Sequence, residues 1–421
     1  MNQSVLIIGG GIGGLTLAHG LKKHGIPFHV FERDFTHDYR SQGYRIRVAR
    51  EAVEALQYLL TDEYWGLFEL INAETNVGSI VEIDATSAHV DDPTLGKSHA
   101  TDSDHQPGPK PYTVDRTLFR GLLLRGLEGS ITYGKTFLRY QSTKSGITAF
   151  FSDGSSADGT LLVGSDGKHS NVRKQAVPNH KILDVGAHCI YGKTPLTKGL
   201  EDAMQPAALE RMNVIKDRSR DQILAMVLEP VRFTNREKLR GHGFSTPQDY
   251  VYWVMVAPPV LFGMLEDEMP HFTAEDAESL AIRLTEKWHP TVRPMVENQQ
   301  PGGTQVLSIT SCPSVLEPWT PNPSVTLLGD AIHLMGPNGS GAVTAIRDAG
   351  FLCGLLVEEG FGIETITKYE AVMRGYAGQT IRISEHALKL MAGQIRGHET
   401  HIGQVAMDLR RALGRLNSSN I

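Results

Sequence analysis

Short apolar runs separated by turns and by amphipathic stretches make up most of the chain. The first run, Val5–Ile8, leads into a glycine-rich segment, a helical stretch from Leu15 to His24, and a second run at Phe28–Phe31. Runs of this length joined by helical segments predict parallel strands with crossover helices. The sequence therefore predicts an α/β fold that opens with a strand–loop–helix–strand unit.

The same pattern returns later in the chain. Apolar strands are predicted at Leu161–Gly164 and Val325–Leu328, and each ends in a turn that pairs glycine with an acid. Between them, residues 181–305 carry no such turn and read as antiparallel strands with one amphipathic helix, which indicates a separate substrate domain. Further elements are predicted as strands at 44–48, 187–191, 222–228 and 250–257, and as helices at 51–60, 274–288, 342–357 and, for the most part, 366–416.

These patterns divide the chain into six segments. Residues 1–84, 112–180 and 306–365 are predicted to form one nucleotide-binding domain in three parts, and residues 181–305 form the substrate domain. Residues 85–111 are rich in Ser, Thr, Asp, His, Gly and Pro without periodicity, which is typical of a long crossing loop. Residues 366–421 are expected to be C-terminal helices.

Composition narrows the classes of function. The chain has 421 residues and a formal net charge of −6, which argues against a general nucleic-acid binder. Its three cysteines, Cys189, Cys312 and Cys353, are few and widely spaced. That spacing excludes a disulfide framework or a cysteine-based metal site, so we predict no metal and a reducing compartment.

Targeting signals are not predicted. The first strand begins within five residues of Met1 without a basic lead-in, and the longest apolar runs fall short of a membrane span. We therefore expect a cytoplasmic protein with no membrane span, whose partner is a small molecule.

The glycines of the first loop each have a mechanical role in nucleotide binding. Gly9 makes the tight turn out of the strand, Gly11 lets a pyrophosphate approach bare backbone, and Gly14 lets the helix pack on the sheet. The helix N-terminus offers unpaired N–H groups to phosphates, and Glu32 follows the second strand, where an acid binds a ribose. The unit predicts a bound dinucleotide; a tight turn without a ligand is the alternative.

Three arginines are candidates for anion binding. Arg45 and Arg47 alternate with apolar residues and so share one side of a strand, as an anion clamp or as a solvated surface. Arg116 lies in the first turn of a predicted helix, where its charge opposes the helix dipole. That mismatch favours a functional role for Arg116.

The three glycine-acid turns together resemble a known family. Asp166-Gly167 and Gly329-Asp330 follow buried strands, and such turns converge at the carboxyl edge of a doubly wound sheet. In this order they resemble the class A flavoprotein monooxygenases, which include para-hydroxybenzoate hydroxylase and many fungal secondary-metabolite hydroxylases. The resemblance covers roughly residues 1–380. It implies FAD as cofactor, NADPH or NADH and O2 as co-substrates, and a Rossmann-like FAD-binding domain with an inserted α+β substrate domain (mixed antiparallel sheet) and C-terminal helices.

The resemblance also implies roles for individual residues. Asp330 would hold the ribityl chain, Asp166-Gly167 would serve both FAD and NAD(P)H, and the loop after Pro337 would lie beside the flavin. That loop departs from the family, because it is one residue shorter and has Val343 where an asparagine is frequent. The full set of cofactor residues implied is Gly9, Gly11, Gly13, Gly14, Glu32, Arg33, Arg45, Arg116, Asp166, Gly167, Asp330, Pro337, Gly339, Gly341 and Ala342.

Catalytic side chains are not certain in such a protein, because the family's reactive species is a flavin C4a-hydroperoxide and the cofactor carries the chemistry. Candidates are Arg45, Tyr191 and His333, the last being either a base or a structural histidine. Tyr250 and Tyr252 share one face of a strand and Trp253 points to the other. Substrate candidates, each with core packing as the alternative, are His188, Tyr191, Lys193, Met226, Tyr252 and Trp253.

The function expected is hydroxylation or epoxidation of an aromatic or conjugated molecule, as in secondary metabolism. A flavin-dependent reductase or dehydrogenase without oxygen insertion is one alternative, and a non-catalytic flavoprotein that binds a ligand is another. A halogenase is not favoured, because the Trp-x-Trp-x-Ile-Pro signature is absent.

Overall fold

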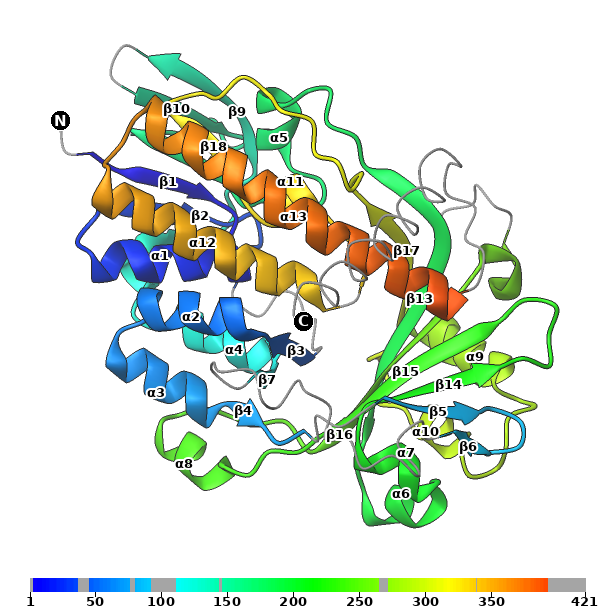
Figure 1. The fold of residues 1–421 in the computed structure, drawn as a ribbon. Helices are drawn as coiled ribbons and strands as arrows, with labels where there is room; N and C mark the ends of the chain where they lie inside the picture. Colours follow the sequence, from blue (N-terminus) through cyan, green and yellow to red (C-terminus); the bar gives the residue numbers. More distant parts are fainter. Residues whose placement is uncertain are drawn as a thin grey trace, which may run out of the picture.

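The molecule is built around two large β-sheets, one of five strands and one of seven, which lie next to each other (Figure 1). The computed structural model describes residues 3–36, 45–75, 80–91, 111–143, 146–264, 272–337 and 339–392. The expected crossing loop, apart from residues 85–91 and 111, and the predicted tail beyond residue 392 lie outside these ranges. The expected α/β class, with a parallel sheet and a separate mixed sheet, is confirmed.

The first sheet is parallel, with five strands in the order β18-β12-β1-β2-β8. Their apolar sequences follow from burial on both faces, as in parallel sheets generally. Helices α1 and α12 cover one face, and the small antiparallel sheet β11-β10-β9 covers the other (Figure 1). The bounds are β1 Val5–Ile8, β2 Phe28–Phe31, β8 Ile131–Thr132, β9 Phe137–Thr143, β10 Gly146–Phe151, β11 Ser156–Gly159, β12 Leu161–Gly164, β18 Val325–Leu327, α1 Ile12–Lys23 and α12 Ser340–Glu358.

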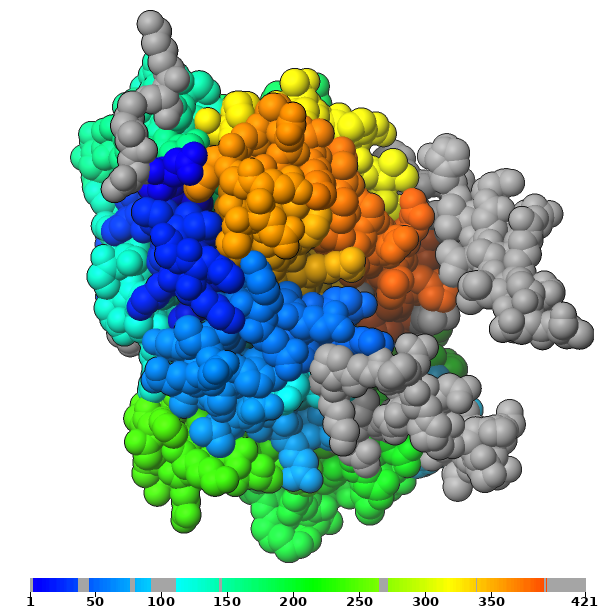
Figure 2. Space-filling view, turned by 60° about the vertical axis from the view of Figure 1, so that its left-hand side comes forward, coloured from blue at the N-terminus to red at the C-terminus, as the bar shows by residue number. Residues whose placement is uncertain are grey.

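Helices from both ends of the chain pack together over this sheet (Figure 2). A Cβ built on Gly20 of α1 would lie 2.2 Å from Leu59 Cδ2 and 2.9 Å from Cys353 Sγ, so only glycine permits this approach. By length and composition α12 is the one helix among the described residues that could cross a membrane, and half of its apolar window is buried inside the fold. The neighbouring helices are α2 Arg50–Leu59, α3 Asp62–Leu70, α4 Arg116–Leu124 and α13 Ile363–Ala392.

The second sheet has seven strands in the order β17-β13-β16-β15-β14-β5-β6. Only β5 and β14 pair in parallel. One face packs against α9 and α10 through residues such as Trp253 and Met255, and the other face meets the first domain and α13. The strands are β5 Val81–Asp84, β6 Val90–Asp91, β13 Leu183–Pro195, β14 Asn213–Asp217, β15 Leu224–Val231, β16 Tyr250–Ala257 and β17 Gln305–Ser311.

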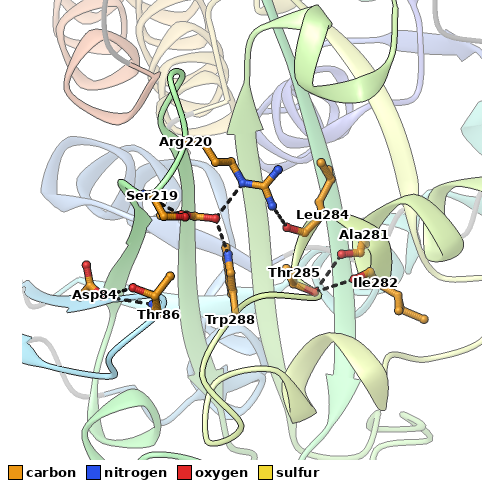
Figure 3. A network of polar contacts seen from close by, with 10 residues as sticks. Asp84, Thr86, Ser219, Arg220, Ala281, Ile282, Leu284, Thr285 and Trp288 are labelled. Carbon is orange, nitrogen blue, oxygen red and sulfur yellow. Dashed lines mark hydrogen bonds and ion pairs between the residues drawn. The ribbon is translucent and has the colours of Figure 1, made fainter.

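A buried polar network ties the β14–β15 hairpin to the helices of this domain (Figure 3). The carboxylate of Asp217 accepts hydrogen bonds from Ser219 N and Oγ, from Arg220 Nε at 2.8 Å and from Trp288 Nε1 at 3.0 Å. Arg220 also donates to the Leu284 carbonyl, which lies at the end of α9. Because the carboxylate is fully buried and well supplied with donors, the network fixes the helix layer on the sheet.

The boundaries expected at residues 84 and 305 are corrected by strand pairing. Strand β5 precedes residue 85 yet pairs with β14 of the second sheet, and β17 extends that sheet to Ser311. A third sheet, β3-β7-β4, joins the two domains. The remaining elements are β3 Arg45–Val48, β4 Asn72–Ala73, β7 Tyr112–Asp115, α5 Asn171–Ala176, α6 Lys198–Ala203, α7 Pro206–Glu210, α8 Arg236–Gly241, α10 Pro294–Glu297, α11 Asp330–His333, α9 Ala274–Leu284 and the 3-10 helices Glu128–Ser130 and Pro259–Phe262.

Candidate functional site

The three glycine-acid turns lie at one edge of the parallel sheet. They follow β1, β12 and β18, which are adjacent and point the same way. Gly9, Gly167 and Gly329 all have positive φ values, of 109°, 75° and 63°. Such an edge, at the carboxyl ends of the strands, is where doubly wound sheets bind ligands.

The glycines of the first loop divide into those that pack against protein and one that faces open space. A Cβ on Gly14 would lie 2.3 Å from Gly9 O, and one on Gly13 would lie 2.7 Å from Leu328 Cδ1. Gly11, at the N-terminus of α1, has no atom within 4 Å of a Cβ built on it. Only Gly11 therefore leaves room for a ligand against the backbone, and Gly13 serves packing.

Glu32 fastens this loop to the end of β2. Its carboxylate accepts from Gly10 N at 2.6 Å and from Asp34 N at 3.0 Å, and the side chain is buried. A carboxylate has about four lone-pair sites, so two remain for a hydroxyl donor. Arg33 is exposed beside it.

One carboxylate oxygen of Asp166 accepts a hydrogen bond from the start of helix α5. Oδ2 accepts from Asn171 N at 2.8 Å, whereas Oδ1 is buried without a hydrogen bond in the described structure. Burial raises the pKa of this carboxyl. The unsatisfied oxygen is available to a donor supplied by a ligand.

Asp330 is the first residue of α11, in the turn after β18. Its side chain is exposed to solvent, while desolvation by the surrounding protein raises its pKa against the opposing effects of His333 and Arg116. Gly341 stands beside it, since a Cβ there would be 3.5 Å from Asp330 Oδ1.

The shortened loop is exposed at its start and half-buried where α12 begins. Pro337 and Gly339 are exposed, Gly341 and Ala342 are half-buried, and Gly339, with φ of 85°, precedes the first turn of α12. A Cβ on Gly339 would lie 3.7 Å from Arg45 Nη1. The Arg45 guanidinium therefore lies close to this loop.

Arg45 and Arg47 are not a solvated pair, because both form ion pairs with Glu229 of β15. Only 1% of the Glu229 side chain is exposed, and 10% of the Arg45 side chain. The Arg45 guanidinium also lies 5.6 Å from the ring centroid of Tyr252. Two cations on one carboxylate leave an excess of positive charge between the loop at Gly339 and the substrate sheet.

A second buried ion pair crosses the same junction. Asp115 Oδ2 accepts from Lys193 Nζ at 2.8 Å and from Tyr250 Oη at 2.9 Å, while Oδ1 accepts from Thr117 N and caps α4. Burial and the Asp115 charge raise the pKa of Tyr250 well above its usual value. Arg116 follows Asp115 directly at the start of α4, and its charge acts to lower the pKa of Asp330.

The substrate candidates fall on two opposite faces of the second sheet. Tyr191, Lys193 and Tyr252 lie on the face toward the first domain. Met226 and Trp253 belong to the core under the helices, and His188 lies there against Phe262. Met226, Trp253 and His188 therefore face away from the nucleotide edge, and we do not assign them as substrate contacts.

Two of the predicted catalytic candidates, His333 and Tyr191, form hydrogen bonds with other side chains of the protein. His333 is fully buried and bonded to Asp348 Oδ2 at 2.6 Å, so it is a structural histidine and not a base. The Tyr191 hydroxyl donates to Gln305 Oε1 at 2.5 Å. Asp115, Glu229 and Asp348 were not singled out from the sequence. Glu229 and Asp348 could have been found, because each is a charged residue within an otherwise apolar strand or helix.

The edge as a whole fits a nucleotide that continues toward the substrate sheet. The open backbone at Gly11 suits a pyrophosphate, and the spare acceptors on Glu32 suit a ribose. The accessible carboxylate of Asp330 suits a polyhydroxyl chain, and the positive charge at Arg45 suits an electron-rich ring. No group of His, Cys, Asp and Glu within the described ranges could hold a metal ion.

Comparison with known proteins identifies the family of the N-terminal part of the chain. Residues 2–184 match the FAD binding domain family. The dual O-methyltransferase/FAD-dependent monooxygenase of Cercospora beticola is 38% identical over 416 residues, covering 93% of this chain and 47% of the relative. The chain thus spans about half the length of this relative.

Solved structures cover the whole fold. A protein of Photorhabdus luminescens, provisionally assigned as an FAD-containing monooxygenase, is 30% identical with a TM-score of 0.78, covering 93% of this chain and 98% of that one. The HpxO protein of Klebsiella pneumoniae in complex with FAD and uric acid has a TM-score of 0.72 at 20% identity, covering 98% and 92% of the two chains. The latter likeness supports the fold alone.

Proposed function

The chain belongs to the FAD-dependent monooxygenases of class A, and from that membership we propose that it uses NAD(P)H and O2 to oxygenate an aromatic or otherwise conjugated small molecule. The observation that carries the proposal is the position of Arg45. Its guanidinium forms an ion pair with Glu229 and lies 5.6 Å from the ring centroid of Tyr252, and a Cβ built on Gly339 would lie 3.7 Å from its Nη1.

The chain's own residues would hold FAD along the sheet edge. Gly11 would meet the pyrophosphate, Glu32 the adenosine ribose, and Asp330 and Arg116 the ribityl region. When bound, FAD supplies the electron transfer from the nicotinamide and the activation of O2. The protein orients both reactants and excludes water from the space between them.

The substrate would lie against the face of the second sheet that carries Tyr252. Tyr252 and Val227 are half-buried on this face, and an aromatic ring beside an apolar side chain suits a flat, conjugated molecule. The excess positive charge at Arg45 and Arg47 favours a substrate with an acidic hydroxyl, since its anion would be stabilised there.

We also propose a place for the enzyme in secondary metabolism. The Cercospora beticola relative is named for O-methyltransferase as well as monooxygenase activity, so the hydroxyl group handled here would be a substrate for O-methylation. The three buried free thiols suit a reducing, cytoplasmic compartment.

Oxygen incorporation tests the proposal. The purified protein should bind FAD and oxidise NADPH faster when conjugated phenols are added, and with 18O2 one labelled atom should appear in the product. Substrate-stimulated oxidation that is unaffected by removing O2, with an unlabelled product, would indicate the reductase instead. Bound FAD that no nicotinamide reduces would indicate a binding protein.

A further inference from the structure

We propose that Asp348 is the positioning residue for Asp330, the carboxylate assigned above to the ribityl chain of FAD. Asp348 lies in α12 and does not face the site. The inference rests on the proposed function for the identity of the ligand only.

The geometry places Asp348 at a junction of three elements. The side chain is fully buried. Oδ2 accepts from Gly329 N at 2.8 Å and from His333 Nε2 at 2.6 Å, and Oδ1 accepts from the Tyr376 hydroxyl at 2.6 Å. One carboxylate therefore joins the turn after β18, the short helix α11 and the long helix α13.

The turn that carries Asp330 depends on this support. Gly329 has φ of 63° and ψ of −148°, a conformation essentially restricted to glycine. Its carbonyl already accepts from Ile332 N and His333 N, so Asp348 satisfies the remaining polar group of Gly329. A buried N–H without a partner would favour rearrangement of the turn, and Asp330 would move with it.

Asp348 also affects Asp330 through its electrostatic interaction with His333. Burial alone would lower the pKa of His333, but the Asp348 carboxylate raises it above its usual value. His333 in turn opposes the rise in the pKa of Asp330 that burial causes, whereas the charge of Asp348 adds to that rise, so a change at Asp348 alters the charge balance around Asp330. Position and charge can be separated, because asparagine keeps the shape of Asp348 without its charge.

Three variants test the role. Asp348→Ala removes all three hydrogen bonds, and Asp348→Asn removes the charge. Tyr376→Phe removes the one donor on the side away from the turn and is the matched control. Apoprotein would be titrated with FAD by flavin fluorescence, urea unfolding would give the stability of each apoprotein, and visible circular dichroism would report the orientation of the bound flavin.

We expect the Kd for FAD to rise by more than about tenfold, or about 1.4 kcal/mol, in Asp348→Ala and by less in Asp348→Asn, with altered flavin dichroism in both. Tyr376→Phe should keep the wild-type Kd and dichroism even though its apoprotein is destabilised. The proposal is overturned if both Asp348 variants bind FAD like wild type, or if Tyr376→Phe loses as much affinity as Asp348→Ala. Failure of the wild-type apoprotein to bind FAD would instead overturn the proposed function, and this inference with it.

Discussion

Replacing Gly11 and Gly14 by alanine should separate cofactor binding from folding, although the two glycines lie three residues apart in one loop. In Gly14→Ala the added Cβ would fall 2.3 Å from Gly9 O and 2.6 Å from Ser165 Oγ. At Gly11, whose φ is −77°, the Cβ would meet no protein atom within 4 Å.

These distances determine how much stability each substitution should cost. Overpacking typically costs about 1–3 kcal/mol, and Gly14→Ala should reach the upper end because Gly9 O belongs to the backbone and cannot rotate away. For Gly11→Ala the loss of a good N-cap and the reduced freedom of the unfolded chain nearly cancel, so the stability should stay within about 1 kcal/mol of wild type. The added methyl group, however, occupies the space proposed for the pyrophosphate.

Urea unfolding of the apoproteins and titration with FAD measure the two effects. Gly14→Ala should unfold at a clearly lower urea concentration. Gly11→Ala should unfold with wild-type stability and bind FAD at least about tenfold more weakly, which corresponds to about 1.4 kcal/mol. The reasoning is refuted if Gly11→Ala binds FAD with the wild-type Kd, or if it destabilises the apoprotein as much as Gly14→Ala.

Three further outcomes are expected. Asp330→Ala should purify largely without FAD, as judged by flavin absorbance; a full complement of yellow cofactor would contradict its role. Glu229→Ala should lower the unfolding free energy by about 3 kcal/mol, the lower end for a broken buried pair, because it leaves the half-buried Arg45 and Arg47 without their partner; a loss below about 1 kcal/mol would show the pairs to be unimportant. Burial raises the pKa of Glu370 from 4.5 to about 7, so the folded protein holds a proton that the unfolded chain releases, and stability should fall by about 3 kcal/mol as pH rises across that window. Glu370→Gln should abolish this fall in urea titrations at pH 5 and pH 8, and an unchanged slope would contradict it.

The turns of the nucleotide edge were predictable because their chemistry is local. Gly9, Gly167 and Gly329 are needed where the backbone turns with positive φ, and such a requirement is visible within a few residues of sequence. The parallel order of the strands then brings distant turns together. For this reason the sequence alone suffices to place Asp166 and Asp330 at one edge.

The faces of the substrate sheet were not predictable in the same way. Alternation along β16 separates Tyr252 from Trp253, but it does not say which face the helices cover. That choice depends on packing by α9 and α10, from residues far along the chain. Glu229 was missed for the same reason, since its partners Arg45 and Arg47 precede it by more than 180 residues.

The interleaving of the two sheets affects how the protein can be made and dissected. Strand β5 enters the substrate sheet before residue 85, whereas β18 completes the nucleotide sheet only at residues 325–327. During synthesis, the nucleotide sheet must therefore wait for its last strand until residues 325–327 have left the ribosome, more than 150 residues after β12, and such distant pairings fold slowly. A fragment cut at residue 184, where the FAD binding domain match ends, would lack β18 and the Asp330 turn. It would be an unfinished sheet with an open edge rather than a portable cofactor module.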